Sequence, residues 1–587
     1  MNKCLCTHWG RGCFLKKPSK YIKLFRSLGN EWKWLLKYVS KYKFQIVFYV
    51  IIGLISTAMG LGASVASKYL IDSVVSHNND TIIKSAVVAV TLGLTQILIS
   101  ALVSRTAGIV GSKISMEIRS NVYQHITFSK WEDIRKYHSG ELLNRIEGDT
   151  NSISNSVISY IPNVFTTSAQ FIGCLAVVLY YDPTMAMFAF MSAPFLAFSS
   201  RLTTKMVRKY NKESREMNGR ILSFYSESIQ NLQMIKAFNI TKRYVEQMKT
   251  NLQLHRKIRL DHDKFTIIMS LCMSVIGLIV AYLCYGWGVY RLWQGAISYG
   301  TMTLFLQISG QLTSSFSSLV SLLPGAITIA TAAGRIMEIT DLPLEENRND
   351  EEARKMEKSA TENGVTIVCD NLKYTYPDGD EPVVGSATFR AEPGETIAFV
   401  GSSGEGKTTL LRLVLGLVEP DSGSLTVETK DGIKIPVSES TRRFCSYVPQ
   451  GNAVFSGTIA DNLRIVKPEA TADEIIDALK IADAWSFIKD LPFGIDTEIS
   501  ENGVNFSEGQ VQRISIARAL LRDAPIIVMD EATSALDAVT EETVLANMMK
   551  VYPNRTRIIT THRPSMLQYC TRVYKVDSNG FLEEIKN

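Results

Sequence analysis

Six long apolar segments within the first 340 residues constrain this chain more than any other feature of its sequence. They lie at approximately 44–72, 82–105, 155–181, 183–204, 265–292 and 299–334. A helix needs about 20 apolar residues to cross a bilayer, and each segment is long enough. The first half of the chain is therefore predicted to be an integral, multi-pass membrane domain with six transmembrane helices.

Basic residues gather on one side of these segments. Lys and Arg are dense before the first segment, over 106–154 and over 205–264, whereas the connections on the other side are short. Since basic loops stay in the cytoplasm, both termini are expected there. No signal peptide pattern precedes the first segment, so that segment is expected to direct insertion. As a separate expectation, the membrane is a bacterial plasma membrane.

The charge balance argues for a lipid bilayer as partner and against nucleic acid. A net charge of +6 over 587 residues is too diffuse for a nucleic-acid-binding surface. Residues 21–42 mix Trp and Tyr with Lys, which predicts an amphipathic helix in the membrane interface, with a plain cytoplasmic helix as the alternative. Cys4, Cys6 and Cys13 surround His8 without CxxC spacing, which fits either a metal site or a reduced cytoplasmic tail.

Few polar residues interrupt the membrane segments, and two pairs stand out. Lys68 and Asp72 have the i,i+4 spacing of an ion pair on one helix. Gln307 and Gln311 share a face of the last segment, where they either line a substrate path or hydrogen-bond to neighbouring helices. The scarcity of charge favours an amphipathic or apolar cargo.

The second half alternates strand and helix patterns, which predicts an α/β domain. Its sequence GSSGEGKT at 401–408 follows the apolar strand 396–400 and opens a helix, the context of a P-loop. Backbone amides of such a loop hold phosphates, Lys407 bridges the β- and γ-phosphates, and the Thr408 hydroxyl binds Mg²⁺. The predicted ATP-binding residues of this loop are Gly401, Ser402, Ser403, Gly404, Glu405, Gly406, Lys407, Thr408 and Thr409.

Two further elements complete a predicted nucleotide site. Asp530 and Glu531 end the apolar strand 526–530, which fits a Mg²⁺ carboxylate followed by a residue that orients the attacking water. Ser507 and Gln510 have capping-box spacing, so a helix begins there and its free amides suit a second phosphate contact. One domain cannot easily bring this helix start to its own P-loop nucleotide, whereas a partner subunit facing head to tail can.

With these motifs the sequence resembles the ATP-binding cassette (ABC) family, specifically exporters that are half-transporters. The resemblance covers nearly the whole chain. It implies an adenine-stacking aromatic at Tyr376, a Q-loop glutamine at Gln450 that belongs to the hydrolytic site and binds Mg²⁺, and a switch histidine at His562. The signature reads FSEGQ at 506–510, where the family usually has LSGGQ. It retains Ser507, Gly509 and Gln510, and the acid at Glu508 is expected to slow turnover.

The resemblance implies an ATP hydrolase that couples Mg²⁺-dependent ATP cleavage to alternating access in a dimer of two copies. A heterodimer stays open, as do an ATP-gated regulator or channel-like protein and an uptake system. Intracellular helices near 121–129 and 231–239 are expected to dock beside Gln450. The expected cargo is a peptide or an amphipathic small molecule. The predicted domains are a tail with its interfacial helix, the membrane domain, a linker and the cassette, at 1–43, 44–336, 337–363 and 364–587.

Overall fold

The computed structural model describes residues 20–184, 206, 209–210, 213–214, 216–402, 404–451, 453–500, 503–577 and 579–585. Two compact units divide the chain, one of Met1–His125 with Ser139–Asp341 and the other of Ile126–His138 with Leu342–Asn587. The cysteine-containing tail, most of the expected span at 183–204, and Ser403 lie outside the described residues.

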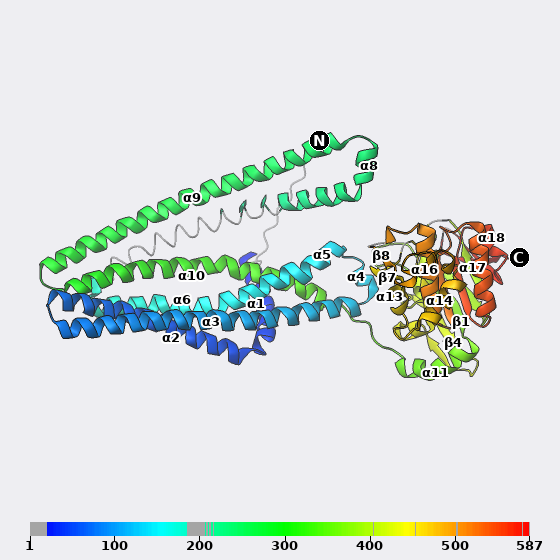
Figure 1. Cartoon of the computed structure of the whole chain (residues 1–587), viewed down its shortest axis with the longest axis horizontal. Coiled ribbons are helices and arrows are strands. Elements are labelled where there is room, and N and C mark those ends of the chain that lie inside the picture. Colours follow the sequence, from blue (N-terminus) through cyan, green and yellow to red (C-terminus); the bar gives the residue numbers. More distant parts are fainter. Residues whose placement is uncertain are drawn as a thin grey trace, which may run out of the picture. The chain divides into compact units, whose positions relative to one another are not determined.

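The first unit is helical. Its labelled elements, followed in blue to green in Figure 1, are α1 (Lys20–Ser40), α2 (Lys43–Val75), α3 (Asn79–Phe128, whose last turn joins the other unit), α5 (Ser139–Asn144), the π-helical turn η1 (Arg145–Asp149), α6 (Thr150–Tyr181), α8 (Leu232–Ala237), α9 (Thr241–Trp293) and α10 (Tyr299–Thr340). Helix α1 occupies the segment predicted as an interfacial helix. Three helical stretches of the described chain are long and apolar enough to cross a membrane: Lys43–Val75, Asn79–Phe128 and Ser139–Tyr181.

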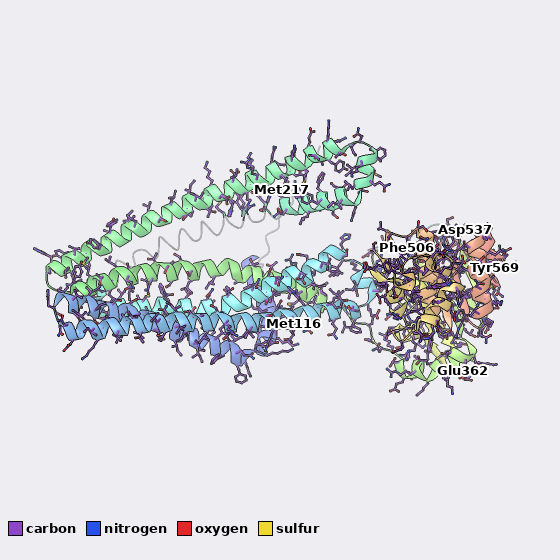
Figure 2. The ribbon with its side chains drawn as sticks, viewed as in Figure 1. Met116, Met217, Glu362, Phe506, Asp537 and Tyr569 are labelled. Carbon is purple, nitrogen blue, oxygen red and sulfur yellow. The ribbon has the colours of Figure 1, made fainter. Side chains whose placement is uncertain are left out.

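Helices α2, α6 and α10 pack together along their lengths, with α3 beside them (Figure 1). The expected spans 265–292 and 299–334 lie within α9 and α10. Lys68 and Asp72 form the predicted ion pair, with 3.2 Å between Nζ and Oδ2. Helix α9 meets α10 at their shared turn and then diverges, and its side chains extend on all sides over much of its length (Figure 2).

The second unit is an α/β domain. Its strands are β1 (Thr366–Tyr374), β2 (Val384–Ala391), β3 (Thr396–Val400), β4 (Ser422–Glu428), β5 (Lys434–Pro436), β6 (Cys445–Val448), β7 (Gly457–Thr458), β8 (Glu498–Ile499), β9 (Ile526–Asp530), β10 (Thr556–Thr560), β11 (Arg572–Val576) and β12 (Leu582–Ile585). Its helices are α4 (Trp131–Ile134), α11 (Asp350–Asn363), α12 (Lys407–Val414), η2 (Glu439–Phe444), α13 (Ile459–Arg464), α14 (Ala472–Ile481), α15 (Trp485–Ile488), η3 (Gly494–Asp496), α16 (Glu508–Leu521), α17 (Ala538–Val551) and α18 (Pro564–Leu567).

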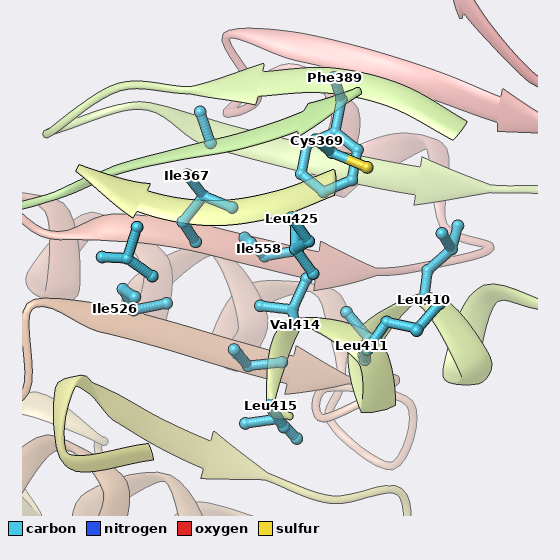
Figure 3. Close-up of a cluster of buried hydrophobic side chains, with 14 of the residues drawn as sticks. Ile367, Cys369, Phe389, Leu410, Leu411, Val414, Leu415, Leu425, Ile526 and Ile558 are labelled. Atoms are coloured by element: carbon cyan, nitrogen blue, oxygen red, sulfur yellow. The ribbon is translucent and has the colours of Figure 1, made fainter. Parts of the chain in front are cut away.

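Two larger sheets form the cassette. The six-stranded sheet has the order β12-β11-β3-β10-β9-β6 and is parallel except for β12, whereas the sheet β2-β1-β4-β5 is antiparallel. Figure 3 shows Leu411 and Val414 of α12 in one apolar cluster with Ile367 of the antiparallel sheet and Ile526 of the parallel sheet. All four side chains are at least 98% buried. This core fixes α12, and with it the loop that precedes α12.

The structure differs from the linker predicted at 337–363. Helix α10 continues to Thr340, and Asp350–Asn363 forms helix α11. Ala353, Met356 and Ala360 of α11 are fully buried in the same cluster as the cassette strands. Most residues of this segment are charged, but Ala353, Met356 and Ala360 form an apolar stripe with i, i+3, i+7 spacing. Such a stripe is sufficient to pack one face of a short helix against the domain.

Candidate nucleotide site

The predicted site residues converge because of the sheet topology. Strands β3, β10, β9 and β6 are parallel neighbours, so their carboxyl ends meet at one edge of the sheet. The P-loop follows β3, Asp530 ends β9, Thr560 ends β10, and Gln450 lies two residues after β6. Ligands of open parallel sheets bind at this edge.

The P-loop has the backbone that a phosphate cradle requires. Gly401, Gly404 and Gly406 have φ angles of 153°, 91° and 94°, a region that residues with a Cβ rarely adopt. Lys407, only 5% exposed, donates from Nζ to the carbonyl oxygens of Gly401 and Ser402 at 2.7 Å each. The lysine therefore spans the mouth of the loop.

Asp530 is 2% exposed and sits between two hydroxyl groups. Its Oδ1 accepts a hydrogen bond from Thr560 Oγ1 at 2.7 Å and another from Thr408 Oγ1 at 3.3 Å. A carboxylate beside the first hydroxyl of a P-loop helix is an oxygen donor set that suits Mg²⁺. The residues present thus fit the predicted metal, with Gln450 Oε1 as a further oxygen donor.

Glu531 contacts both of the other residues predicted to act in hydrolysis, Gln450 and His562. Its Oε2 accepts from Gln450 Nε2 at 2.7 Å, and its Oε1 pairs with His562 Nε2. Glu531 has a φ of 46°, a left-handed conformation that costs about 1–3 kcal/mol in a residue other than glycine. The Glu531 amide donates a hydrogen bond to Thr560 Oγ1 at 2.9 Å. Thr560 therefore bonds to both adjacent acids, Asp530 and Glu531.

Tyr376, the predicted adenine contact, lies over the P-loop helix. Its hydroxyl lies 3.1 Å from Thr409 Oγ1 and accepts a hydrogen bond from Arg412 Nη1 at 2.7 Å. The Arg135 guanidinium lies 4.3 Å from the Tyr376 ring centroid, a cation–π distance. Tyr376 is therefore held both by the cassette strands and helices and by a segment from far upstream in the chain.

That upstream segment, Ile126–His138, belongs to the cassette unit. Tyr374 donates a hydrogen bond to Glu132, and burial, followed by this bond, raises the pKa of Tyr374 far above its usual range. Lys130 donates to Glu419 at 3.0 Å. The part of the chain that joins the cassette unit thus begins at 126, and its described contacts include Tyr374 and Tyr376. Docking of 121–129 beside Gln450 stays a prediction. The segment 231–239, expected beside Gln450 as well, lies in the other unit.

The signature begins helix α16 as the spacing predicts. Ser507 is the N-cap: its Oγ accepts from Gln510 N at 3.3 Å, and its own amide donates to Gln510 Oε1 at 2.9 Å. A Cβ on Gly509 would lie 2.9 Å from the Ala535 carbonyl, so a glycine permits this close approach. No hydrogen bond within the described parts of the cassette joins residues 507–510 to the P-loop.

Sequence reasoning missed two residues that organise the site. Thr560 reads as a strand residue, and only the polar run Thr560–His562 at the strand end signals its role. Gln512, 2% exposed, donates from Nε2 to the Glu531 carbonyl at 3.3 Å and accepts from Ala535 N at 3.0 Å. It connects α16 to the acidic strand β9 and to the segment that follows it, Ser534–Asp537, which matches the D-loop of the ABC family.

A phosphate-binding loop, a Mg²⁺-suited acid and a glutamate–histidine pair on one sheet edge, in a chain with long apolar helices, define a membrane-bound P-loop ATPase. The ABC transporter transmembrane region model matches residues 46–316, and the ABC transporter model matches 384–534. The chain belongs to the ABC transporter family, as an exporter-type half-transporter with its membrane domain fused to its ATP-hydrolysing domain. ATP binding and hydrolysis coupled to transport follow from that membership.

Individual relatives agree with this assignment. A putative multidrug export ATP-binding/permease protein of Staphylococcus aureus is 26% identical over 556 residues, covering 93% of this chain and 95% of the relative. An uncharacterized ABC transporter ATP-binding protein of Bacillus subtilis is 28% identical over 471 residues, covering 80% and 76%. The solved structure of a bacterial Atm1-family ABC exporter with ATP bound shares the fold, with a TM-score of 0.78 and 23% identity over 92% of this chain and 94% of that one.

Proposed function

We propose that two copies of this chain export a peptide or an amphipathic small molecule across a bacterial plasma membrane, with both termini in the cytoplasm. The observation that carries the proposal is the division of the nucleotide site. The P-loop, both acids and His562 share one sheet edge, whereas the Ser507 helix start makes no hydrogen bond to them within the described residues. A second copy facing head to tail brings each helix start to the other copy's phosphates.

Two features support a partner of the same sequence. The N-terminus of α16 carries backbone amides and a positive dipole end that suit a phosphate, and Ser507 and Gln510 make no hydrogen bond to the described P-loop residues of their own chain. Helix α9 leaves Ile267, Leu271 and Val275 between 56% and 60% exposed while diverging from its own bundle. Because Glu531 is present in this chain, a homodimer has two hydrolytic sites.

The residues divide the chemistry as follows. Glycine amides and Lys407 hold the phosphates and Tyr376 stacks on adenine, while the Ser507 and Gly509 amides contact the partner's γ-phosphate. Thr408, Asp530 and Gln450 would hold Mg²⁺, which would neutralise charge on the phosphates. Glu531 orients the attacking water and His562 holds the γ-phosphate.

In the described geometry both carboxylate oxygens of Glu531 are engaged, one by Gln450 and one by His562. Each oxygen keeps a second lone pair that can accept a proton of the attacking water, and opening one of these bonds would free a further acceptor site. Closure of two cassettes around ATP is the event that re-aims the Gln450 and His562 side chains toward the phosphates and frees the carboxylate.

Substitution of Glu531 tests this account. Glu531→Gln should bind ATP with little change yet lower turnover at least about 100-fold, because an amide cannot act as a base. The trapped species should run as a closed dimer in size-exclusion chromatography with ATP present. Glu542→Gln is the matched control and should hydrolyse ATP normally, because the Glu542 carboxylate lies on the surface and accepts a hydrogen bond from Tyr569. Normal turnover in Glu531→Gln would overturn the assignment.

A further inference from the structure

A polar cavity of about 490 Å³ lies inside the membrane domain, between α2, α3, α6 and α10. Its volume falls in the range of about 300–1,000 Å³ that is typical of small-molecule sites. Along α2 it extends from Gly53 to Ser67, a length of roughly 20 Å at 1.5 Å per residue. All of its lining residues lie in the four packed helices of one unit.

The lining is polar but uncharged. Among the described residues that line it are four glutamines and several Ser and Thr residues, and none is Asp, Glu, Lys, Arg or His. The glutamines come from three helices: Gln96, Gln170, Gln307 and Gln311. Polar groups at membrane depth are costly and are usually retained for function.

Most hydroxyl groups of the lining are committed to the protein. Thr57, Ser64 and Thr166 donate to carbonyl oxygens one turn earlier on their own helices, at 2.9–3.2 Å. Ser56 and Ser100 lie 3.0 Å apart and pair with each other. Each of these hydroxyl groups already has one hydrogen-bond partner, so it has less hydrogen-bonding capacity left for a ligand.

The glutamine amides differ in this respect. Gln311 Nε2 lies 3.4 Å from Ser64 Oγ, so this residue bonds to a neighbouring helix. The amides of Gln96, Gln170 and Gln307 make no hydrogen bond to any described residue. The two roles weighed for the glutamine pair of the last helix are therefore split: Gln311 ties helices together and Gln307 faces the cavity.

Packing against α2 orients one of these free amides. A Cβ placed on Gly60 would lie 2.8 Å from Gln96 Nε2 and 3.0 Å from its Oε1. The amide thus rests on the bare backbone of α2, a position that no larger residue at 60 permits. Glycine at this helix crossing keeps the Gln96 donor and acceptor inside the cavity.

We infer that this cavity binds the exported molecule, and that its cargo is an uncharged molecule rich in amide groups, such as a blocked or cyclic peptide. A primary amide offers two donors and an acceptor, which complements the N–H and C=O of a peptide group. None of the described residues that line the cavity is charged, so none of them can form an ion pair that compensates a charged ligand for its desolvation in the membrane. The inference rests on the proposed export function and specifies its substrate class.

Binding to full-length, nucleotide-free protein in lipid nanodiscs tests the inference without requiring transport. The probes are three tripeptides, N-acetyl-Leu-X-Leu-amide with X as Gln, Lys or Glu, together with the apolar cation tetraphenylphosphonium. The neutral peptide should bind at least ten-fold more tightly than either charged peptide and more tightly than the cation. Equal or tighter binding of a charged probe would overturn the inference.

Matched variants locate the site. Gln307→Leu should weaken binding of the neutral peptide about three- to ten-fold, the range for one lost hydrogen bond, and Gln307→Asn should recover part of it. Gln45→Leu, an exposed α2 position outside the cavity, should bind as the parent does. Should Gln307→Leu fail to fold, Gly60→Ala, which displaces the Gln96 amide, takes its place. Unchanged affinity in these cavity variants would refute the site.

ATPase activity is measured on the same preparations to separate the two proposals. Hydrolysis and export without selective binding of the neutral peptide leave the exporter function standing and refute the substrate class. Selective binding without hydrolysis in the parent protein refutes the export function and leaves the ligand class standing.

Discussion

Thr560→Val is the substitution that most directly probes how the hydrolytic edge is held. The side chains have nearly the same shape, so the change removes the hydroxyl with little effect on packing. Thr560 is 2% exposed, and its Oγ1 donates to Asp530 at 2.7 Å and accepts from the Glu531 amide at 2.9 Å. One methyl group thus replaces the only side-chain bridge between the Asp530 carboxylate and the Glu531 amide among the described residues.

The free energy of unfolding should fall by about 3 kcal/mol. A hydrogen bond to a charged group contributes about 1.5–3 kcal/mol, and a buried amide left unpaired costs about 1–3 kcal/mol. For a domain of this size, 1 kcal/mol shifts the melting temperature by about 2–4 °C. The unfolding transition of the cassette should therefore drop by roughly 6–12 °C.

The rate of ATP hydrolysis should also fall, even at temperatures where the variant is fully folded. The hydrogen bond from the Glu531 amide to Thr560 Oγ1 helps to hold Glu531 at its strained φ of 46°. Loss of this hydrogen bond lets the Glu531 carboxylate move. A misplacement of about 1 Å costs up to about 100-fold in rate. ATPase assays below the melting transition should show a turnover about 10- to 100-fold lower, with ATP affinity nearly unchanged.

Thr560→Ser supplies the control because it keeps the hydroxyl and loses only a methyl group. It should hydrolyse ATP at a rate near that of the parent protein. If Thr560→Val turns over as fast as Thr560→Ser, the hydroxyl bridge does not position Glu531 and the reasoning fails.

Three further changes have definite expected outcomes. Tyr374→Phe removes the hydrogen bond to Glu132 and should lower the stimulation of ATPase activity by cargo, while basal ATPase activity persists. The control Tyr569→Phe loses a surface hydrogen bond to Glu542 and should change neither activity. Equal effects of the two substitutions would contradict a role of Glu132 and its segment in coupling. Arg335→Ala removes the ion-pair partner of the 2%-exposed Asp149. Because the Arg335 side chain is about half exposed, the change should cost roughly 1–2 kcal/mol in a thermal unfolding assay, with partial recovery in the double variant that also carries Asp149→Asn. Burial raises the pKa of three cassette thiols to about 11 or 12, so at pH 8 they stay protonated and alkylation should require denaturant: Cys369, Cys445 and Cys570.

The parts of the site that lie in continuous motifs could be predicted from the sequence. The P-loop, the acids after β9 and the Ser507 cap each depend on residues within a few positions of one another, and local chemistry fixes their geometry. Strand β3 and the capping box at Ser507 form as expected. Convergence of Gln450 and His562 on Glu531 came from the family resemblance, and the sheet order supplies its physical cause.

What could not be predicted depends on side chains that meet only in three dimensions. Thr560 is 30 residues from Asp530 and looks like an ordinary β-branched strand residue. The family resemblance predicts that an intracellular helix near 121–129 docks on the cassette, but nothing local in Ile126–His138 specifies its contacts with Tyr374 and Tyr376. The cavity glutamines lie on three helices. The sequence of any one helix does not reveal how it is rotated relative to the other two.

Gln512 shows why the division of the nucleotide site matters for the whole cycle. It lies in the second turn of α16, whose first residues form the signature, and it bonds both to the Glu531 carbonyl and to the D-loop amide of Ala535. In the proposed dimer the signature serves the partner's ATP, whereas Glu531 serves the ATP of its own chain. A displacement of α16 when the partner's phosphate binds is therefore passed through one buried amide to the backbone that aims Glu531. The two nucleotide sites of such a dimer are linked through protein as well as through shared ligands, which gives a physical reason for them to act together.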